Sequence, residues 1–288
     1  MNEEENFLLK LHLCQVSLKN ELRVAHYIMA YKRCPTKKEF ESLLDLENER
    51  KEQLWDQVNS EDIASRAEFE LSQAKVLTIL DKRYPSQLQE IYDPPVVLFY
   101  RGNIALLNAN NFLGVVGARN CSMYAFYTIR RLLPPVIKKD VVIVSGLAKG
   151  VDGYAHRICL DNKGKAIAIL GNGLDVFYPE CNHYLQDALS HKGLLLTEYP
   201  SGTHPLKYYF PLRNRIIAGL CQSLLVVEAK QRSGSLITAN LALQNDRNVL
   251  AIPGRLSDPN SVGCNELIAA GAKAVLSSED IMEEFVHF

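Results

Sequence analysis

Seven short apolar runs recur from residue 112 onward and constrain the fold more than any other feature. They span 112–116, 141–144, 166–170, 194–197, 223–228, 248–252 and 273–276. Runs of this length are typical of buried strands, and the segments between them are long enough to form helices. Alternating strands and helices indicate βαβ units with a mainly parallel sheet. We therefore predict an α/β fold with helices on both faces of the sheet.

Residues 1–75 follow a different pattern, in which apolar side chains recur at near-helical spacing. Ser60 precedes the last of these stretches, where a helix is expected to start. We predict a small all-helical domain at 1–75, a connector with the first strands of the sheet at 76–111, and the main α/β domain at 112–288.

Composition limits the classes of protein to which the chain can belong. It has 288 residues, 47% of them hydrophobic and 23% charged, as in a globular protein with a sizeable core. No apolar run approaches the roughly 18 residues that a membrane-spanning helix needs. The acidic start MNEEENFLLK also differs from a basic signal peptide. We expect a cytoplasmic protein without membrane contacts.

Charge and cysteine content bear on the possible ligands. The net charge is −1, so only a local cluster of basic residues can support binding to nucleic acid. Seven cysteines are scattered along the chain without the CxxC or Cys/His spacing of a metal site. The pattern favours free cysteines in a reducing compartment. We expect neither a metal ion nor a cofactor.

Basic side chains lie in the loops that follow the predicted strands. Because the carboxyl ends of parallel strands meet at one edge of a sheet, we expect these cations to line one groove. Glycine and serine turns before the helix starts add backbone N–H groups that attract phosphate. The cations are Arg119, Lys149, Lys207, Arg213, Arg215, Lys230 and Arg232.

The segment 197–220 carries two arginines beside the predicted start of a helix. An Arg at such a position offers a fork of donors suited to phosphate, so Arg213 and Arg215 are candidate ligands of a polynucleotide. The alternative is that both arginines only form structural ion pairs with neighbouring carboxylates. Tyr208 and Phe210 precede them and either stack on bases or pack the loop onto the sheet.

Motifs that would indicate catalysis are missing from the sequence. It has no GxxxxGK[ST] loop for nucleotides, no GxSxG nucleophile elbow and no HExxH zinc motif. Glu198 and Glu228 are single acids at predicted strand ends, without a close carboxylate partner. The sequence therefore predicts positions that bind phosphate and no catalytic residue.

Several separated segments, in the same order along the chain, resemble the DprA or Smf family (DNA processing protein A). The resemblance covers roughly residues 80–275. The segments are RYPSQLQEIYDPPVVLFYRGN (83–103), VGARNCSMY (116–124), SGLAKGVD (145–152), AIAILGNGLDVFYPECN (166–182), TEYPSGTHPLKYYFPLRNRIIAGL (197–220), VVEAKQRSGSLITANLAL (226–243) and AIPGR (251–255).

This resemblance implies an extended Rossmann-like fold that binds single-stranded DNA and not a dinucleotide. It implies a homodimer that protects incoming single strands during natural transformation and loads the recombinase RecA onto them in homologous recombination. The helical N-terminus is compatible with the family's sterile-alpha-motif-like domain. Some relatives also carry a C-terminal winged helix, which this chain is expected to lack.

The resemblance also assigns roles to residues of this chain. The matching motifs imply DNA contacts at Arg119, Lys207, Arg213, Asn214 and Arg215, and a phosphate pocket lined by Ser145, Gly146 and Gly150. From the loops themselves we add Lys149, Ser233 and Gly234 as candidate DNA ligands. For the dimer interface the resemblance indicates Cys264, Leu267, Ile268 and Val275.

One departure from the family pattern bears on DNA binding. Glu180 follows Tyr178 and Pro179, at a position that is often basic in the family that this chain resembles, and a carboxylate there would repel phosphate.

An alternative function is a nucleotide-processing hydrolase on a related Rossmann-like fold. Such phosphoribohydrolases use a PGGxGTxxE segment, and the corresponding turn at 233–240 lacks both the double glycine and the Glu.

Overall fold

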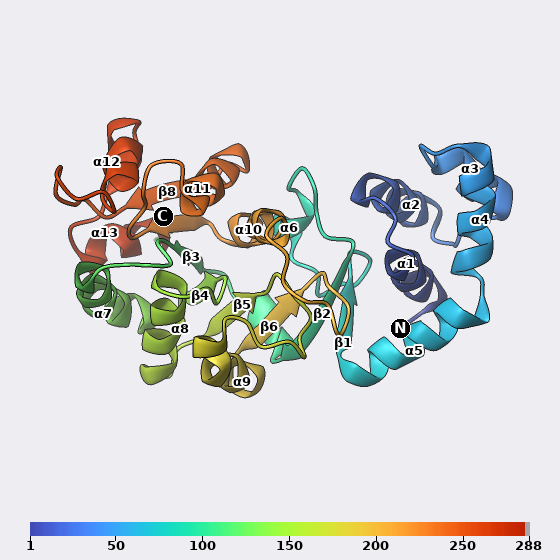
Figure 1. Ribbon diagram of the computed structural model, residues 1–288, viewed down its shortest axis with the longest axis horizontal. Coiled ribbons are helices and arrows are strands. Elements are labelled where there is room, and N and C mark those ends of the chain that lie inside the picture. Colours follow the sequence, from blue (N-terminus) through green and yellow to red (C-terminus); the bar gives the residue numbers. More distant parts are fainter. Residues whose placement is uncertain (286–288) are drawn as a thin grey trace.

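The computed structural model describes residues 1–285, which form a helical N-terminal region followed by a nine-stranded α/β domain. The two parts lie side by side along the longest axis of the molecule (Figure 1). The fold is therefore α/β with a preceding helical region, as predicted.

Five helices make up the N-terminal region. Ser60 caps the last of them, accepting a hydrogen bond from the Ile63 N–H, as the sequence predicts. The rings of Phe7, Phe40 and Trp55 pack together in its core. The helices are α1 (Glu3–Leu13), α2 (Leu18–Tyr31), α3 (Lys37–Leu43), α4 (Asn48–Val58) and α5 (Glu61–Gln73).

The sheet has the strand order β1-β2-β6-β5-β4-β3-β7-β8-β9. Strands β3 to β9 run parallel, whereas β1 pairs antiparallel with β2, and β2 antiparallel with β6. The strands are β1 (Lys75–Thr78), β2 (Val97–Gly102), β3 (Phe112–Val116), β4 (Val142–Ser145), β5 (Ala166–Ile169), β6 (Leu194–Thr197), β7 (Ser223–Val226), β8 (Asn248–Ala251) and β9 (Lys273–Ala274).

Helices cover both faces of this sheet (Figure 1). On one face lie α7 (Met123–Ile137), α8 (Val151–Asp161) and α9 (His183–Lys192), and on the other α10 (Tyr209–Leu220) and α11 (Gly234–Gln244). The shorter elements are α6 (Ser86–Gln89), α12 (Val262–Ala269), α13 (Ser278–Met282) and the 3₁₀ turns η1 (Ile104–Asn108), η2 (Glu180–Asn182) and η3 (Glu283–Phe285).

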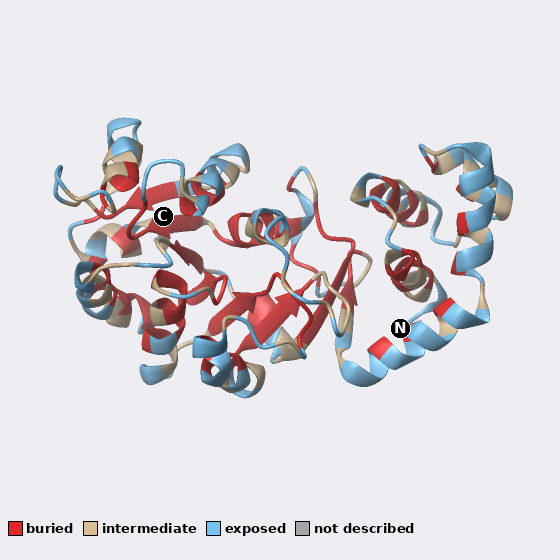
Figure 2. Ribbon diagram, in the orientation of Figure 1, coloured by how far each residue is buried: buried red, intermediate tan, exposed pale blue. Residues whose placement is uncertain are grey.

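The core lies along the strands, which are almost entirely buried (Figure 2). Strands that are covered on both faces carry continuous apolar runs, and for this reason the positions of these strands could be predicted from the sequence. β3 coincides with the predicted run 112–116, while β9 is limited to two residues of the predicted 273–276. The connector adds β1 and β2 to the sheet, and α1 packs against both strands. Within residues 1–285, no helix has the length and apolar character that crossing a membrane requires.

Candidate functional site

A basic groove of about 580 Å³ opens at the carboxyl ends of the central strands. It lies where the turns after β3 and β4 meet the starts of α10 and α11, at the edge where open α/β sheets place ligands. Its lining residues are Val116, Gly117, Ala118, Arg119, Asn120, Ala148, Asp152, Tyr178, Lys207, Phe210, Pro211, Arg213, Asn214, Lys230, Ser233, Gly234, Ser235 and Thr238.

The turn after β3 presents Arg119 to this groove. Gly150 packs closely against the backbone of this turn. Its φ is +84°, and a Cβ at this position would lie 2.4 Å from the carbonyl oxygen of Ala118. On the other side, Ser122 caps α7 and donates its backbone N–H to the buried carboxylate of Glu228 at 2.9 Å. Arg119 itself is exposed, with its guanidinium 4.8 Å from the centre of the Phe210 ring.

Arg213 forms part of the floor of the basic groove. Its side chain is buried, and Nη1 donates to the carbonyl oxygen of Ile169 at the end of β5, at 3.1 Å. A Cβ on Gly146 would overlap this guanidinium, so the glycine leaves the space that the Arg occupies. Burial lowers the pKa of Arg213 to about 10, despite the nearby carboxylate of Asp152, so the side chain stays charged at neutral pH.

The charge of Arg213 is only partly compensated. Its Nε has no hydrogen-bond partner within the described chain, and it forms no ion pair with any carboxylate of residues 1–285. Asp152 accepts instead from the backbone N–H of Gly146 at 3.1 Å, and burial raises the pKa of this carboxyl. A buried cation without a paired anion favours an anionic ligand.

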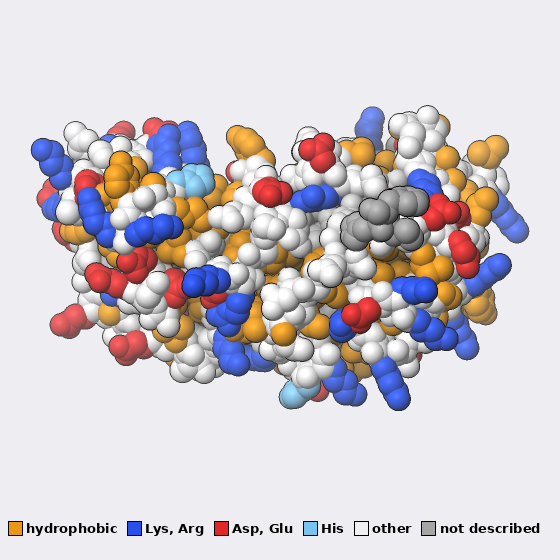
Figure 3. All heavy atoms as spheres, turned by 180° about the vertical axis from the view of Figure 1, so that it is seen from behind, with side chains coloured by type: hydrophobic (Ala, Val, Ile, Leu, Met, Phe, Trp, Pro, Cys, Tyr) orange, Lys and Arg blue, Asp and Glu red, His pale blue; other side chains and the backbone are white. Residues whose placement is uncertain are grey.

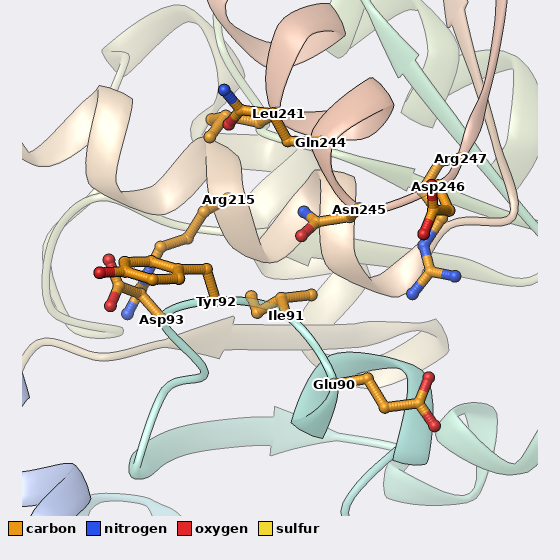
Figure 4. A pocket seen from close by; sticks show the side chains of 10 residues that line it. All are labelled: Glu90, Ile91, Tyr92, Asp93, Arg215, Leu241, Gln244, Asn245, Asp246 and Arg247. Atoms are coloured by element: carbon orange, nitrogen blue, oxygen red, sulfur yellow. The ribbon is translucent and has the colours of Figure 1, made fainter.

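The structure does not bring Arg215 into the groove. Its guanidinium donates two hydrogen bonds of 2.6 Å to the two carboxylate oxygens of Glu198, and both side chains are largely buried. Arg215 instead lines a separate cavity of about 550 Å³, together with Tyr92, Asp93 and Arg247 (Figure 4). For Arg215 the structure therefore shows the ion pair that was the alternative to a DNA contact.

The start of α11 supplies a further set of donors. Ser233 is its N-cap residue, but its hydroxyl caps no backbone N–H of the first turn and lies instead 3.2 Å from the Ser235 hydroxyl. Ser233, Gly234, Ser235 and Thr238 all line the groove. Uncapped N–H groups and the positive end of the helix dipole attract anions.

A small recess of about 40 Å³ adjoins the basic groove. Gly146 and Lys149 line it, and Arg119 and Arg213 border both spaces. Next to it the rings of Tyr178 and Phe210 stack with their centres 5.7 Å apart and an interplanar angle of 29°. Aromatic surface therefore lies directly beside the cations of the groove.

The predicted site residues fall into three groups. Arg119, Lys207, Arg213, Asn214, Ser233 and Gly234 meet in the basic groove, and Gly146 and Lys149 in the recess beside it. Ser145 and Gly150 lie beneath the site, where Ser145 donates its hydroxyl to the carbonyl oxygen of Val115 at 2.6 Å. Arg215 lies on another side of α10.

Sequence reasoning left Tyr178, Asn120 and Thr238 out of the candidate site. Tyr178 follows β5 in a strand-end loop, so its position in the chain was a usable signal. Thr238 lies one helical turn after Gly234, and the spacing of α11 would have indicated that both share a face.

Charge at the groove differs from charge elsewhere on the molecule. The groove has four cations, Arg119, Lys207, Arg213 and Lys230, and Asp152 is the one acid among the described residues that line it. By contrast, basic and acidic side chains are interspersed over the face shown in Figure 3. A neutral protein thus concentrates positive charge at one site.

Titratable groups near the groove already have structural roles. Glu228 accepts from Ser122, and Glu198 is paired with Arg215. His156 is fully buried, and burial lowers its pKa to about 4, so it is neutral. In the part of the chain that the structure describes, no three His, Cys, Asp or Glu side chains are arranged to hold a metal ion.

The residues expected at a dimer interface are only partly accessible. Cys264 and Val275 are buried within the chain, and the Cys264 thiol lies 3.6 Å from the carbonyl oxygen of Val226. Leu267 and Ile268 of α12 are half-buried and present part of their surface to solvent.

Comparison with known proteins relates this arrangement to one family. The family model described as DNA recombination-mediator protein A matches residues 75–286. The DNA processing protein DprA of Streptococcus pneumoniae strain R6 is 51% identical over 208 residues, covering 72% of this chain and 73% of that protein.

Two solved structures share the fold at different levels of similarity. The X-ray structure of DprA from Streptococcus pneumoniae has a TM-score of 0.92 and 40% identity, covering 98% of this chain and 99% of that chain. A structure of DNA processing protein A from Helicobacter pylori, described for its single-stranded DNA binding mode, has a TM-score of 0.67 and 28% identity. It covers 74% of this chain and 97% of that one.

Proposed function

The chain belongs to the DNA recombination-mediator protein A family, and on this premise we propose that it binds single-stranded DNA in the basic groove. One observation carries the proposal: Arg213 is a buried cation without a paired anion, on the floor of a groove that also holds Arg119, Lys207 and Lys230. The Helicobacter pylori relative, described as a single-stranded DNA binder, supports the same ligand.

Binding would be mainly electrostatic and independent of sequence. The four cations neutralise phosphates, and the N–H groups at the start of α11 donate hydrogen bonds to them. All of these contacts are to the sugar–phosphate backbone of the DNA and not to its bases. Tyr178 and Tyr208 keep exposed ring surface on which bases stack, whereas Phe210 packs against Arg119 and Tyr178. Glu180, the first residue of η2, is exposed two positions after Tyr178 and should weaken phosphate binding there.

We further propose that the protein acts in natural transformation by protecting incoming single strands and loading RecA onto them. The family description as a recombination mediator supports this role. It would act in the cytoplasm, by binding and not by turnover. The acids at the strand ends, Glu198 and Glu228, are both engaged in structural hydrogen bonds, which favours a binding protein over a nucleotide hydrolase.

A homodimer built through the C-terminal part of the fold completes the proposal. Leu267 and Ile268 retain accessible surface, and Leu276, just beyond the edge strand β9, is 73% exposed. Leu267→Lys should convert the dimer to a monomer in light scattering. A dimer of unchanged mass would place the interface elsewhere.

Fluorescence anisotropy of a labelled single-stranded oligonucleotide tests the DNA-binding proposal. With four phosphates neutralised, log affinity should fall with log salt at a slope of about −3, and the single strand should be preferred over the duplex. Arg119→Ala should weaken binding without unfolding the protein, whereas Arg130→Ala, an exposed arginine of α7 outside the groove, should not. Absence of binding by the unmodified protein at low salt would contradict the proposal.

A further inference from the structure

The N-terminal helices hold the loop that leads from β6 to the basic groove. His12 of α1 donates from Nε2 to the carbonyl oxygen of Glu198 at 2.7 Å. Glu70 of α5 accepts the backbone N–H of Ser201 at 3.0 Å. The β6–α10 loop, residues 198–208, is therefore attached to the helical region at two points within four residues.

Strand order explains this contact. β6 pairs with β2, and α1 packs against β1 and β2, so the carboxyl end of β6 emerges beside the helical region (Figure 1). Both contacts are well shielded from water: Glu70 is 2% exposed and the side chain of His12 14%. Shielded hydrogen bonds to charged groups are stronger than exposed ones.

The partners of His12 determine its charge. Its Nδ1 lies 3.1 Å from a carboxylate oxygen of the buried Glu21, and its Nε2 faces the Glu198 carbonyl. Both partners only accept, so both ring nitrogens must carry a proton, which makes the side chain an imidazolium. Burial opposes this charge, but Glu21 and Glu198 outweigh burial and raise the pKa of His12 to about 9.

The far side of the β6–α10 loop is fixed by the α/β domain. The Gly202 N–H donates to both carboxylate oxygens of Asp175 at 2.9 Å, and the Gly173 N–H donates to the carbonyl oxygen of Thr203 at 2.9 Å. Held on both sides, the chain continues directly to Lys207, an exposed residue that lines the groove.

We infer that the N-terminal helical region positions the β6–α10 loop for DNA binding, with His12 and Glu70 as positioning residues that do not touch the DNA. The inference rests on the proposed function. Without these two attachments the loop would sample more conformations, and ordering it on binding would lower the affinity. Glu198 extends the link to α10, because its carbonyl binds His12 while its carboxylate binds Arg215.

Four variants of the full chain test this role. Glu70→Ala removes the acceptor for Ser201, whereas Glu70→Gln retains an acceptor of the same shape. His12→Gln removes the imidazolium. Glu68→Ala is the matched control, since it deletes an exposed acid of the same helix whose side chain makes no hydrogen bond or ion pair with another described residue.

Two measurements separate positioning from contact. Amide hydrogen exchange of the segment 198–208, without DNA, should be faster in Glu70→Ala and His12→Gln and unchanged in Glu70→Gln, Glu68→Ala and the groove variant Arg119→Ala. Anisotropy should show single-strand affinity reduced about tenfold in the first two variants, the effect of one charged hydrogen bond. Their salt slope should match that of the unmodified protein, because no phosphate contact is lost.

The outcomes distinguish this inference from the proposed function. Normal affinity in Glu70→Ala and His12→Gln, or normal loop exchange, would overturn the positioning role while leaving DNA binding intact. A reduced salt slope would also overturn it, since that result means a direct phosphate contact. If the unmodified protein does not bind the oligonucleotide, the proposed function fails and this inference fails with it.

Discussion

Arg213 and Arg215 lie two residues apart on α10 and face opposite sides of that helix. Arg213 reaches the carbonyl oxygen of Ile169 and the basic groove, whereas Arg215 is bound by both carboxylate oxygens of Glu198. The helical rotation of about 100° per residue separates the two directions by about 200°. The charge of Arg213 is therefore only partly compensated, whereas Arg215 is paired with a carboxylate, which gives the two residues different expected roles.

Arg213→Ala should weaken single-strand binding about 10- to 100-fold, the range expected for a lost charged hydrogen bond. The salt slope should fall by about 0.7, since one phosphate contact disappears. The free energy of unfolding should change little, because removing a buried cation without a paired anion also removes its desolvation cost. Anisotropy and urea denaturation of the same variant check both parts. A large loss of stability would mean that Arg213 is structural.

Arg215→Ala should show the opposite pattern. Removal of one partner leaves the Glu198 carboxylate buried and unpaired, which costs about 3–5 kcal/mol of unfolding free energy. The double variant Glu198→Gln with Arg215→Met should recover much of this loss, because neither charge remains. Urea denaturation measures both. Unchanged stability together with a strong loss of DNA binding in Arg215→Ala would restore the DNA contact predicted from the sequence.

Gly150→Ala should distort the turn that carries Arg119. An added Cβ would lie 2.4 Å from the Ala118 carbonyl oxygen, and the φ of +84° is one that residues other than glycine rarely adopt. We expect a loss of about 1–3 kcal/mol in unfolding free energy together with weaker DNA binding. Gly271→Ala is the control: its φ is +105° but no atom lies within 4 Å, so stability alone should fall. Normal DNA binding by Gly150→Ala would mean that the position of Arg119 does not depend on this glycine.

The contribution of His12 to stability should depend on pH. Its pKa is about 9 in the folded protein, against an ordinary value of 6.5. The contribution is therefore complete below pH 6.5 and is lost as the pH rises through 9. Relative to His12→Gln, the unmodified protein should lose on the order of 2–3 kcal/mol across this window. Urea denaturation of both proteins at pH 6 and pH 9.5 tests this, and a constant difference would mean that His12 is neutral when folded.

Much of the fold could be predicted because it depends on local patterns. The apolar runs of the parallel strands are continuous, since both faces of the sheet are covered, and they marked β3 to β8 within a residue or two. The helix start after Ser60 was predicted from an equally local pattern. The cations were found for the same reason, because parallel strands bring their carboxyl ends to one edge.

Only the tertiary structure decided which of these residues act together. Periodicity places Arg213 and Arg215 on opposite sides of a helix but does not say which side faces the groove; that depends on the Glu198 carboxylate, brought to α10 by the end of β6. The family resemblance placed Cys264 and Val275 at a dimer interface, yet neighbouring elements of the same chain bury both side chains.

The hydrogen bond between His12 and Glu198 is the clearest example of a contact that could not be predicted from the sequence. The two residues are 186 positions apart, and their contact exists because β2 pairs with β6 and α1 covers that edge of the sheet. The sequence by itself determined the strands, the helix starts and the edge at which the cations gather. Long-range packing decided which charges are neutralised and which remain free to bind an anion, because burial and pairing depend on neighbours distant in the chain.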